Sequence, residues 1–376
     1  TANWKWDLTK ATTLQSLFFS CTNFDADLSD FDTSKANGGG NINLTNMFYN
    51  CTSFNNNGSP GIGNWDTSNV SSLSHTFYNA DSFNQPIGNW DTSNVTTFQS
   101  AFYSANIFNQ NLGNWDTSNA TTFYRFFRQT SFNNGGSDSI IYWDTSNVTT
   151  FNECFYQTPF NHPIGSWDVS GATGTTPFTS MFSSAQSFNQ PLAAWSSSIK
   201  GNLTNMFYNA DSFDQDLGSW DMSSVTSLQN FVYSANIFNN GGTGSINSWD
   251  MSSCTSFYRA FRNASLFNQP VGGWTMNTSS NYNCYEMFYQ CNSFDQSLAG
   301  WNISKLSNGG LFLYQVTLST SNYDATLVAW GAQSGSVISG VNMHFGNSEY
   351  TSGSLADQRR QDLIDAGWTI TDGGYA

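Results

Sequence analysis

Aspartates that follow a tryptophan at a spacing of about 25 residues are the first side chains in this chain that could do chemistry. Asp66, Asp91 and Asp116 belong to this series, and carboxylates at a fixed spacing can hold calcium together with carbonyl oxygens. Neighbouring carboxylates about 5 Å apart repel each other by roughly 0.8 kcal/mol in water, so a compensating partner is required. No spacing here matches an EF-hand, and the N–H groups that follow each aspartate are an alternative partner. We therefore favour helix capping over a calcium site.

A row of tyrosine and arginine side chains offers binding chemistry. It occupies one position of each repeat, directly after a phenylalanine, and two further arginines lie beside it. The candidate binding residues are Tyr49, Tyr78, Tyr103, Arg125, Arg128, Tyr208, Tyr233, Arg259 and Arg262. Tyrosine and arginine are enriched at binding hot spots, and we expect these side chains to be at least half exposed. The alternative is that the rings pack on one another along the repeats and bind nothing.

Cysteines and histidines are the remaining side chains that could serve as catalytic or metal-binding groups. Cys21 and Cys51 take equal positions in consecutive repeats, which predicts a disulfide between them. All six cysteines take apolar core positions of the repeat, and the other four are predicted to be reduced; they are Cys154, Cys254, Cys284 and Cys291. His162 takes a position that Gln85 holds in another repeat, which is typical of a surface variant. No C-x-x-C pair indicates a metal site.

An enzyme is not expected from these residues. Glycoside hydrolysis needs a pair of carboxyl groups, of which one is an acid with a raised pKa. The aspartates instead recur as ladders, which a repeated structure dictates by itself. We predict no catalytic residue and no cofactor.

The element that must position these side chains is a repeat of about 25 residues. Tryptophan returns at this spacing from Trp65 to Trp301, and Trp6 and Phe31 extend the series to twelve coils. Self-similarity at this period is typical of stacked units that cannot bury their apolar faces alone. A longer duplication lies on top of it, because residues 123–128 recur as residues 257–262.

Within one coil the pattern changes from turn-like to helical. Val95, Phe98 and Phe102 are spaced three and four residues apart, which predicts a short helix. Pro86 lies in the other half, so residues 83–90 are expected to be extended and to pair as short parallel strands. The asparagines that follow the first phenylalanine of each coil are expected to satisfy backbone groups of the next coil.

Two parts of the chain follow from where the repeat ends. Residues 1–310 are predicted to form a repeat solenoid and residues 311–376 a C-terminal cap. The cap is expected to contain a helix at 355–366 that Gly367 stops. Three coils carry four-residue insertions, which predict loops.

The composition of the chain limits the kinds of partner that it could bind. The chain has 26 Asp and Glu against 11 Lys and Arg, a net charge of -15, and no basic cluster, which argues against nucleic acid and anionic membranes. No apolar run approaches membrane-spanning length, so no membrane insertion is expected. The low lysine and glutamate content favours an extracellular location.

The repeated pattern W-D-x-S-N-V-T, followed by spaced phenylalanines and F-N, resembles the BspA-like leucine-rich-repeat surface proteins over residues 4–303. This resemblance implies a leucine-rich-repeat-like solenoid that is secreted or held at the cell surface. It also implies adhesion to a protein or glycan of a host or neighbouring cell, with no catalytic residues. The alternative is a structural or receptor-binding component of a larger assembly, such as a viral or phage fibre.

Overall fold

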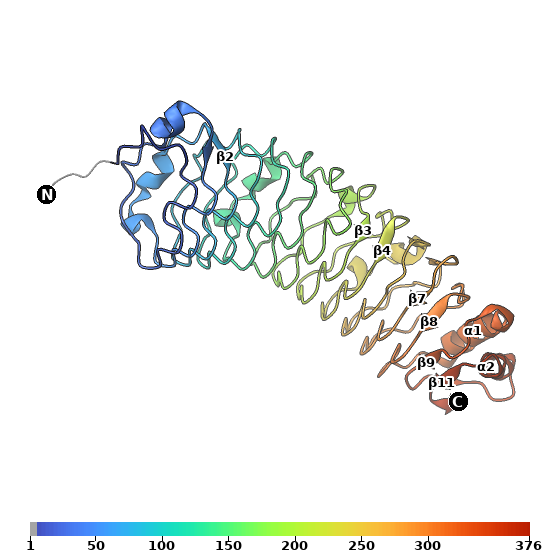
Figure 1. Cartoon of the computed structure of the whole chain (residues 1–376). Helices are drawn as coiled ribbons and strands as arrows, with labels where there is room; N and C mark the ends of the chain where they lie inside the picture. The colour runs from blue at the N-terminus through green and yellow to red at the C-terminus, as the bar shows by residue number, and fades with distance from the viewer. Residues whose placement is uncertain (1–5) are drawn as a thin grey trace. The chain divides into compact units, whose positions relative to one another are not determined.

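The computed structural model describes residues 6–376, so residues 1–5 of the predicted array lie outside the described part. The chain divides into two compact units, residues 1–190 and residues 191–376, and each unit is described by itself. In both, successive copies of the repeat lie next to one another as coils (Figure 1). The boundary predicted at residue 310 between the repeats and the cap stays a prediction.

The segment predicted as a helix in each coil is a run of turns. In residues 98–105, backbone N–H groups alternate between two kinds of acceptor. The even-numbered residues from 100 to 104 donate to carbonyls of the next coil at 2.8–3.0 Å, whereas the odd-numbered residues from 101 to 105 donate to the carbonyl three residues back at 2.9–3.2 Å. Bonds between coils thus take the place of the i→i−4 bonds of a helix.

Left-handed residues enforce this alternation. Ser100 and Ser104 both have a φ of 52°, and the same two positions have positive φ in the other coils, where Asn, Ser and Gln are frequent occupants. A residue in this region ends an α-helix, and small polar side chains tolerate it best after glycine. The predicted helix is therefore wrong: the spacing of three and four is also produced by a turn run that points its phenylalanines inward.

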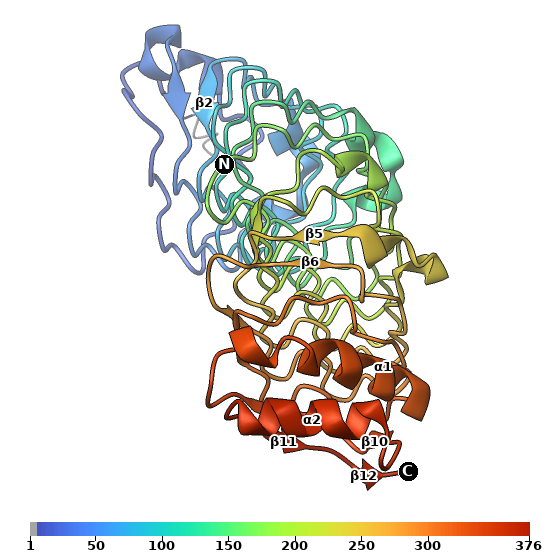
Figure 2. The same ribbon diagram turned by 90° about the vertical axis from the view of Figure 1, so that its right-hand side faces the viewer.

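Short parallel strands precede the turn run, at the point where the helix was expected to start. In the first unit β1 (Ile42–Asn43) pairs with β2 (Val70–Ser72), and Ser72 bridges to Thr97. In the second unit the pairs within the repeats are β3 (Gly201–Asn202) with β4 (Val225–Ser227), β5 (Asp250–Met251) with β6 (Thr275–Met276), and β7 (Tyr282–Asn283) with β8 (Leu306–Asn308). Near the C-terminus, β9 (Asn342–His344) pairs with β11 (Thr369–Thr371), and β10 (Glu349–Tyr350) pairs with β12 (Gly374–Tyr375) (Figures 1 and 2).

The half of the coil predicted to pair as strands is held by side chains instead. Residues 83–90 contain no strand. The Asn84 side-chain oxygen accepts the backbone N–H of Asn109 at 2.9 Å and the amide of Gln110 at 2.9 Å, both from the next coil. In the next coil the Asn109 side-chain oxygen accepts the backbone N–H of Asn133 in the same way, at 2.7 Å. The predicted asparagine ladder is confirmed, and it replaces the expected backbone pairing.

Turns of 3-10 helix form the insertions. They are η2 (Asn56–Gly58) with η3 (Pro60–Asn64), η4 (Asn134–Gly136) with η5 (Asp138–Tyr142), and η7 (Asn240–Gly242) with η8 (Ser245–Ser248); η1 (Thr33–Gly39), η6 (Ala193–Trp195) and η9 (Ser334–Ser336) lie elsewhere. Asn56, Asn134 and Asn240 are fully buried at the start of these loops. The oxygen of each accepts a leucine N–H of the preceding coil at 2.7–2.8 Å.

The core of each unit is built from columns of stacked rings. Phe77 lies on Phe102 of the next coil with ring centroids 5.4 Å apart and an interplanar angle of 8°. The tryptophans also bond between coils, because the indole N–H of Trp115 donates to the carbonyl of Ile87 at 3.0 Å. Trp90 and Trp115 are only 2% and 3% exposed, which confirms the predicted aromatic core in this unit.

Two α-helices end the second unit, α1 (Thr320–Gly331) and α2 (Leu355–Asp365), which lie side by side in Figure 2. The indole of Trp330 in α1 donates to the carbonyl of Leu298 at 2.8 Å, so α1 continues the tryptophan column. The predicted second helix is confirmed: Ser354 caps its start, and Gly367 follows with a φ of +96°. No helix in residues 6–376 is both long and apolar enough to span a bilayer.

We expect Trp115→Phe to lower the free energy of unfolding by about 2–3 kcal/mol, because it deletes a buried hydrogen bond and leaves a void. Urea titration followed by circular dichroism measures the loss. Trp6→Phe is the control, because Trp6 is 45% exposed and its loss should cost less than about 1 kcal/mol. Equal losses in both variants would contradict the role given to the column.

Candidate functional site

Seven of the nine candidate binding residues lie in a stacked row in each unit, here called the aromatic ladder, and Arg125 and Arg259 lie beside it. It comprises Phe19, Tyr49, Tyr78, Tyr103, Arg128 and Tyr156 in the first unit and Tyr208, Tyr233, Arg262, Tyr289 and Tyr314 in the second. Tyr78 lies between Tyr49 and Tyr103, with ring centroids 4.5 and 4.4 Å away and interplanar angles of 8° and 5°. In the second unit Tyr208 stacks on Tyr233 at 4.9 Å. The predicted row exists, and its rings pack along the coils.

Stacking changes what the ladder can offer a ligand. The tyrosines are partly buried, not half exposed as predicted, because each inner ring covers the faces of its neighbours. Burial, followed by the neighbouring Tyr103 and Tyr49, raises the pKa of Tyr78 to about 12, so its phenol stays protonated at neutral pH. A partner would therefore meet ring edges and neutral hydroxyl groups, not ring faces.

Arginine replaces tyrosine once in the ladder of each unit and keeps the stack continuous. The Arg128 guanidinium lies 5.4 Å from the ring centroid of Tyr103 and 3.9 Å from that of Tyr156. Arg262 is held in the same way, 5.5 Å from Tyr233 and 4.0 Å from Tyr289. A flat cation between two aromatic faces is a favourable arrangement.

A glutamate of the next coil joins each ladder arginine to the arginine beside it, forming an Arg–Glu cluster. Glu153 accepts from Arg125 Nε at 2.8 Å and from Arg128 Nη1 at 2.5 Å. The second cluster repeats this arrangement: Glu286 accepts from Arg259 Nε at 2.8 Å and also pairs with Arg262. The glutamate side chains are 17% and 5% exposed, so each cluster is a partly buried unit with one excess positive charge.

The two glutamates were missed by the sequence interpretation. A signal was present, because the chain has only three glutamates and two of them, Glu153 and Glu286, take the same repeat position. That position is left-handed, with φ values of 55° and 53°, and in other coils it holds serine, asparagine, histidine, leucine or the partner arginines Arg125 and Arg259. Charged side chains at a strained backbone position indicate that the pairing with arginine outweighs the backbone cost.

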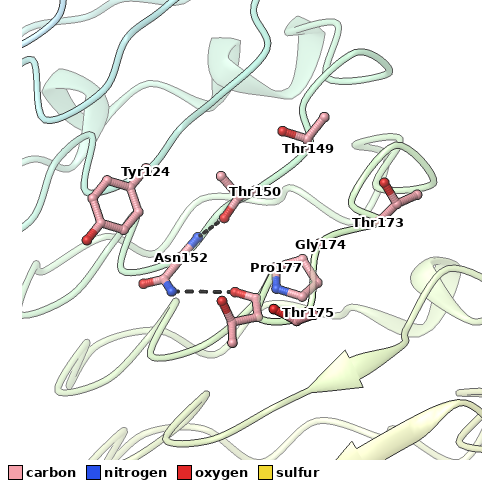
Figure 3. Close-up of a pocket in the computed structure, with 9 residues that line it drawn as sticks. Tyr124, Thr149, Thr150, Asn152, Thr173, Gly174, Thr175 and Pro177 are labelled. Atoms are coloured by element: carbon pink, nitrogen blue, oxygen red, sulfur yellow. Dashed lines mark hydrogen bonds between the residues drawn. The ribbon is translucent and has the colours of Figure 1, made fainter.

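A groove lies beside the first Arg–Glu cluster. Its nine lining residues are Tyr124, Thr149, Thr150, Asn152, Thr173, Gly174, Thr175, Thr176 and Pro177, and its volume is about 470 Å³ (Figure 3). Asn152 is tied to both walls, through its N–H to the Thr150 hydroxyl at 3.2 Å and through its side-chain amide to the Thr176 carbonyl at 3.4 Å. Sequence reasoning did not single out this groove.

The aspartate ladder makes local hydrogen bonds. Asp91 Oδ1 accepts the backbone N–H and the hydroxyl of Ser93, at 3.0 and 2.6 Å, and Asp66 and Asp116 accept the N–H two residues on in the same way. The capping bond is thus confirmed, but it caps a turn and not a helix. In residues 6–376 no group of three or more His, Cys, Asp or Glu side chains is arranged to hold a metal ion.

His162 is a structural side chain at a buried position. It is 6% exposed, as is Gln85 at the equivalent position, so the expectation of a surface variant is wrong. Its Nε2 lies 2.8 Å from the Asn133 carbonyl, which is the contact that the Gln85 amide makes with Asn55 at 2.9 Å. Its Nδ1 lies 2.7 Å from the Asp138 carboxylate.

All six cysteines are free thiols in the structure. Cys51 is buried, its Sγ donates to the Phe18 carbonyl at 2.8 Å, and burial raises its pKa to about 12. Cys21 is exposed, contrary to the expected core position, because no described coil lies before it. The Cys21–Cys51 disulfide stays a prediction for the protein under oxidising conditions. The other four thiols are buried as predicted.

Acid is expected to weaken the fold through the aspartate ladder. The Ser93 hydroxyl, and then its N–H, hold the pKa of Asp91 below its ordinary value, and Asp168 and Asp221 are lowered in the same way. A carboxylate whose pKa is lower in the folded state stabilises the protein above the unfolded-state pKa of about 3.9. This stabilisation is lost as the pH falls through the folded-state pKa. The melting temperature should therefore fall between about pH 4.5 and pH 2.

Replacing these three aspartates together by asparagine should flatten that acid-induced fall. At pH 7 the variant should melt close to the parent, because an asparagine oxygen still accepts the N–H bond. An acid profile as steep as the parent's would show that other carboxyl groups cause it.

Glu153→Gln should cost about 1–2 kcal/mol of unfolding free energy, because Arg125 is 38% exposed and regains water. Glu286→Gln should cost more, about 2–4 kcal/mol, because the lost carboxylate is only 5% exposed. Glu349, the exposed third glutamate, is the control, and Glu349→Gln should change stability by less than about 0.5 kcal/mol in urea titrations. The reverse order for the first two would contradict the assigned burial.

Comparison with known proteins identifies the repeat. The family DUF285, described as a Mycoplasma protein of unknown function, matches residues 3–60, 42–139, 131–244 and 242–326. No curated protein and no solved structure matches the chain. The four matched segments overlap and extend together from residue 3 to residue 326, well over half of the 376 residues. With this repeated match, the chain belongs to the DUF285 family and is a repeat protein.

Proposed function

We propose that this chain is a non-enzymatic recognition module, secreted or displayed at a cell surface, whose coils form a leucine-rich-repeat-like solenoid of the BspA-like type. Its partner is a protein or glycan on the surface of a host or neighbouring cell. The partner contacts the aromatic ladder at several coils at once.

The observation that carries this proposal is the regular spacing of the ladder. Phenol hydroxyl groups recur on consecutive coils from Tyr49 to Tyr103, with ring centroids 4.4–4.5 Å apart. Many weak contacts at fixed spacing add up by effective concentration, so a repetitive partner gains affinity without a deep pocket. Stacking also fixes each side chain before binding, which lowers the entropy lost on association.

Arginine adds specificity to this row. Arg125 and Arg259 are 38% and 34% exposed, although both bond to a glutamate. Their free N–H groups favour partners with carbonyl, hydroxyl or acidic oxygens. In a chain with a net charge of -15, two such cationic points are local exceptions. They would help to place a partner along the row.

The test removes the phenol hydroxyl groups of the ladder and keeps the aromatic rings. The triple variant Tyr49→Phe, Tyr78→Phe, Tyr103→Phe retains the stack, because phenylalanine has the same ring. Binding to an array of glycans and cell-surface proteins should weaken tenfold or more, which is about 1.4 kcal/mol. Alanine would be a poorer choice, because each lost ring pair costs about 0.5–1.5 kcal/mol of stability.

Tyr142→Phe is the matched control, since Tyr142 is 83% exposed and lies outside the ladder. Its binding should equal that of the parent. Undiminished binding by the triple variant would refute the ladder as the contact surface. Detectable turnover of any polysaccharide on the array would refute the non-enzymatic assignment.

A further inference from the structure

The duplicated block offers an internal comparison for the groove. Tyr124 and Tyr258 are equivalent, and each carries the guanidinium of its neighbouring arginine 4.7 Å from its ring centroid. In the second unit Tyr285 of the next coil also stacks on Tyr258, at 5.5 Å and 12°. In the first unit Asn152 stands where Tyr285 stands. The shorter side chain leaves beside Tyr124 the space that a ring fills in the other copy.

Extra residues in the following coil form the opposite wall. From Trp167 to Phe178 there are eleven positions, whereas from Trp143 to Phe151 there are eight. The three additional residues belong to the loop of residues 173–177. In Figure 3 the Asn152 side chain lies between Tyr124 and this loop. The groove therefore results from a smaller side chain than the duplicated copy has in one coil and from additional residues in the next.

The lining is polar but uncharged. It comprises five threonines, one asparagine, one glycine, one proline and the phenol of Tyr124, with no Asp, Glu, Lys, Arg or His. Hydroxyl groups both donate and accept, and an amide does the same. A ligand that suits this lining is neutral, rich in hydroxyl groups and apolar on one face. A peptide fits less well, because its main chain needs a free strand edge, and the coil backbones here already bond to one another.

One acceptor in the groove has no partner within the described chain. Asn152 Oδ1 is buried and receives no hydrogen bond, while the amide nitrogen of the same side chain is engaged with the Thr176 carbonyl. A buried polar atom without a partner is costly, and each one calls for an explanation. A ligand hydroxyl would supply the missing donor once the Asn152 side chain turns its oxygen into the groove.

We propose that the groove bounded by Tyr124, Asn152 and residues 173–177 binds a neutral carbohydrate. One face of a sugar ring lies against Tyr124, in the place that Tyr285 takes on Tyr258 in the other copy. Its hydroxyl groups bond to Asn152 Oδ1 and to the threonines. The volume of about 470 Å³ is within the roughly 300–1,000 Å³ of small-ligand sites and leaves room for a short oligosaccharide. This site is separate from the aromatic ladder and does not depend on it.

The test uses the whole chain and an array of neutral and sialylated oligosaccharides, followed by calorimetry with the strongest neutral binder. Asn152→Tyr should rebuild the ring pair seen in the second unit and close the groove, with a loss of affinity of tenfold or more and an unchanged melting temperature. Tyr124→Ala should also lose binding. Tyr258→Ala, at the equivalent position, should bind like the parent, and the ladder triple variant should retain sugar binding as well.

Each other outcome overturns the proposal. Full sugar affinity in Asn152→Tyr would place the site elsewhere. Binding of sialylated sugars alone, or of peptides in place of sugars, would refute the neutral class of ligand. No binding of any neutral oligosaccharide by the folded parent would refute the site itself. Loss of sugar binding in the ladder triple variant, with Asn152→Tyr unaffected, would assign the sugar to the ladder instead.

Discussion

Hydrogen bonding between neighbouring coils is the constraint from which the rest of each unit follows. Every second N–H of the turn run donates to the next coil, and this is possible only because two residues per coil adopt a left-handed conformation. With the backbone committed in this way, equivalent side chains of consecutive coils must lie above one another. The ring columns of the core, the asparagine ladder and the aromatic ladder are all results of that register.

The same register explains which parts were predictable. Trp115 and Asn84 could be placed from their residue types, since an aromatic ring or an amide at a constant repeat position has few partners other than its own copy. The helix could not be excluded, because Val95, Phe98 and Phe102 point inward equally well from a helix and from a turn run. What decides between them is the bond to the next coil, which is a contact across about 25 residues and leaves no local mark.

The candidate site was predictable where it follows the repeat and not where it departs from it. The row containing Tyr78 and Tyr103 was found from position alone, although its stacking lowers its exposure. The groove arises from two features, Asn152 where the duplicated copy has Tyr285 and a longer loop after Trp167. Neither feature predicts a groove until the coils are placed side by side. Glu153 is an intermediate case, since rarity made it noticeable but its arginine partners lie in another coil.

Stability and recognition draw on the same side chains in the ladder. The rings that would present hydroxyl groups to a partner also join coil to coil, and Arg128 is at once a stacking group, an ion-pair donor and a candidate contact. The groove differs in this respect. Asn152 and the loop beyond it lie outside the ring columns, so their chemistry can change with little effect on the core.

Because an internal coil offers its two neighbours the same pattern of donors and acceptors, whole coils are interchangeable parts. Adding or removing one complete coil leaves every remaining bond with an equivalent partner, whereas adding part of a coil shifts the alternation of the turn run and breaks it. Evolution can therefore lengthen or shorten such an array by whole coils, one or several at a time, without redesigning it. The copied block that places Arg125 and Arg259 in matching surroundings is a record of such a step.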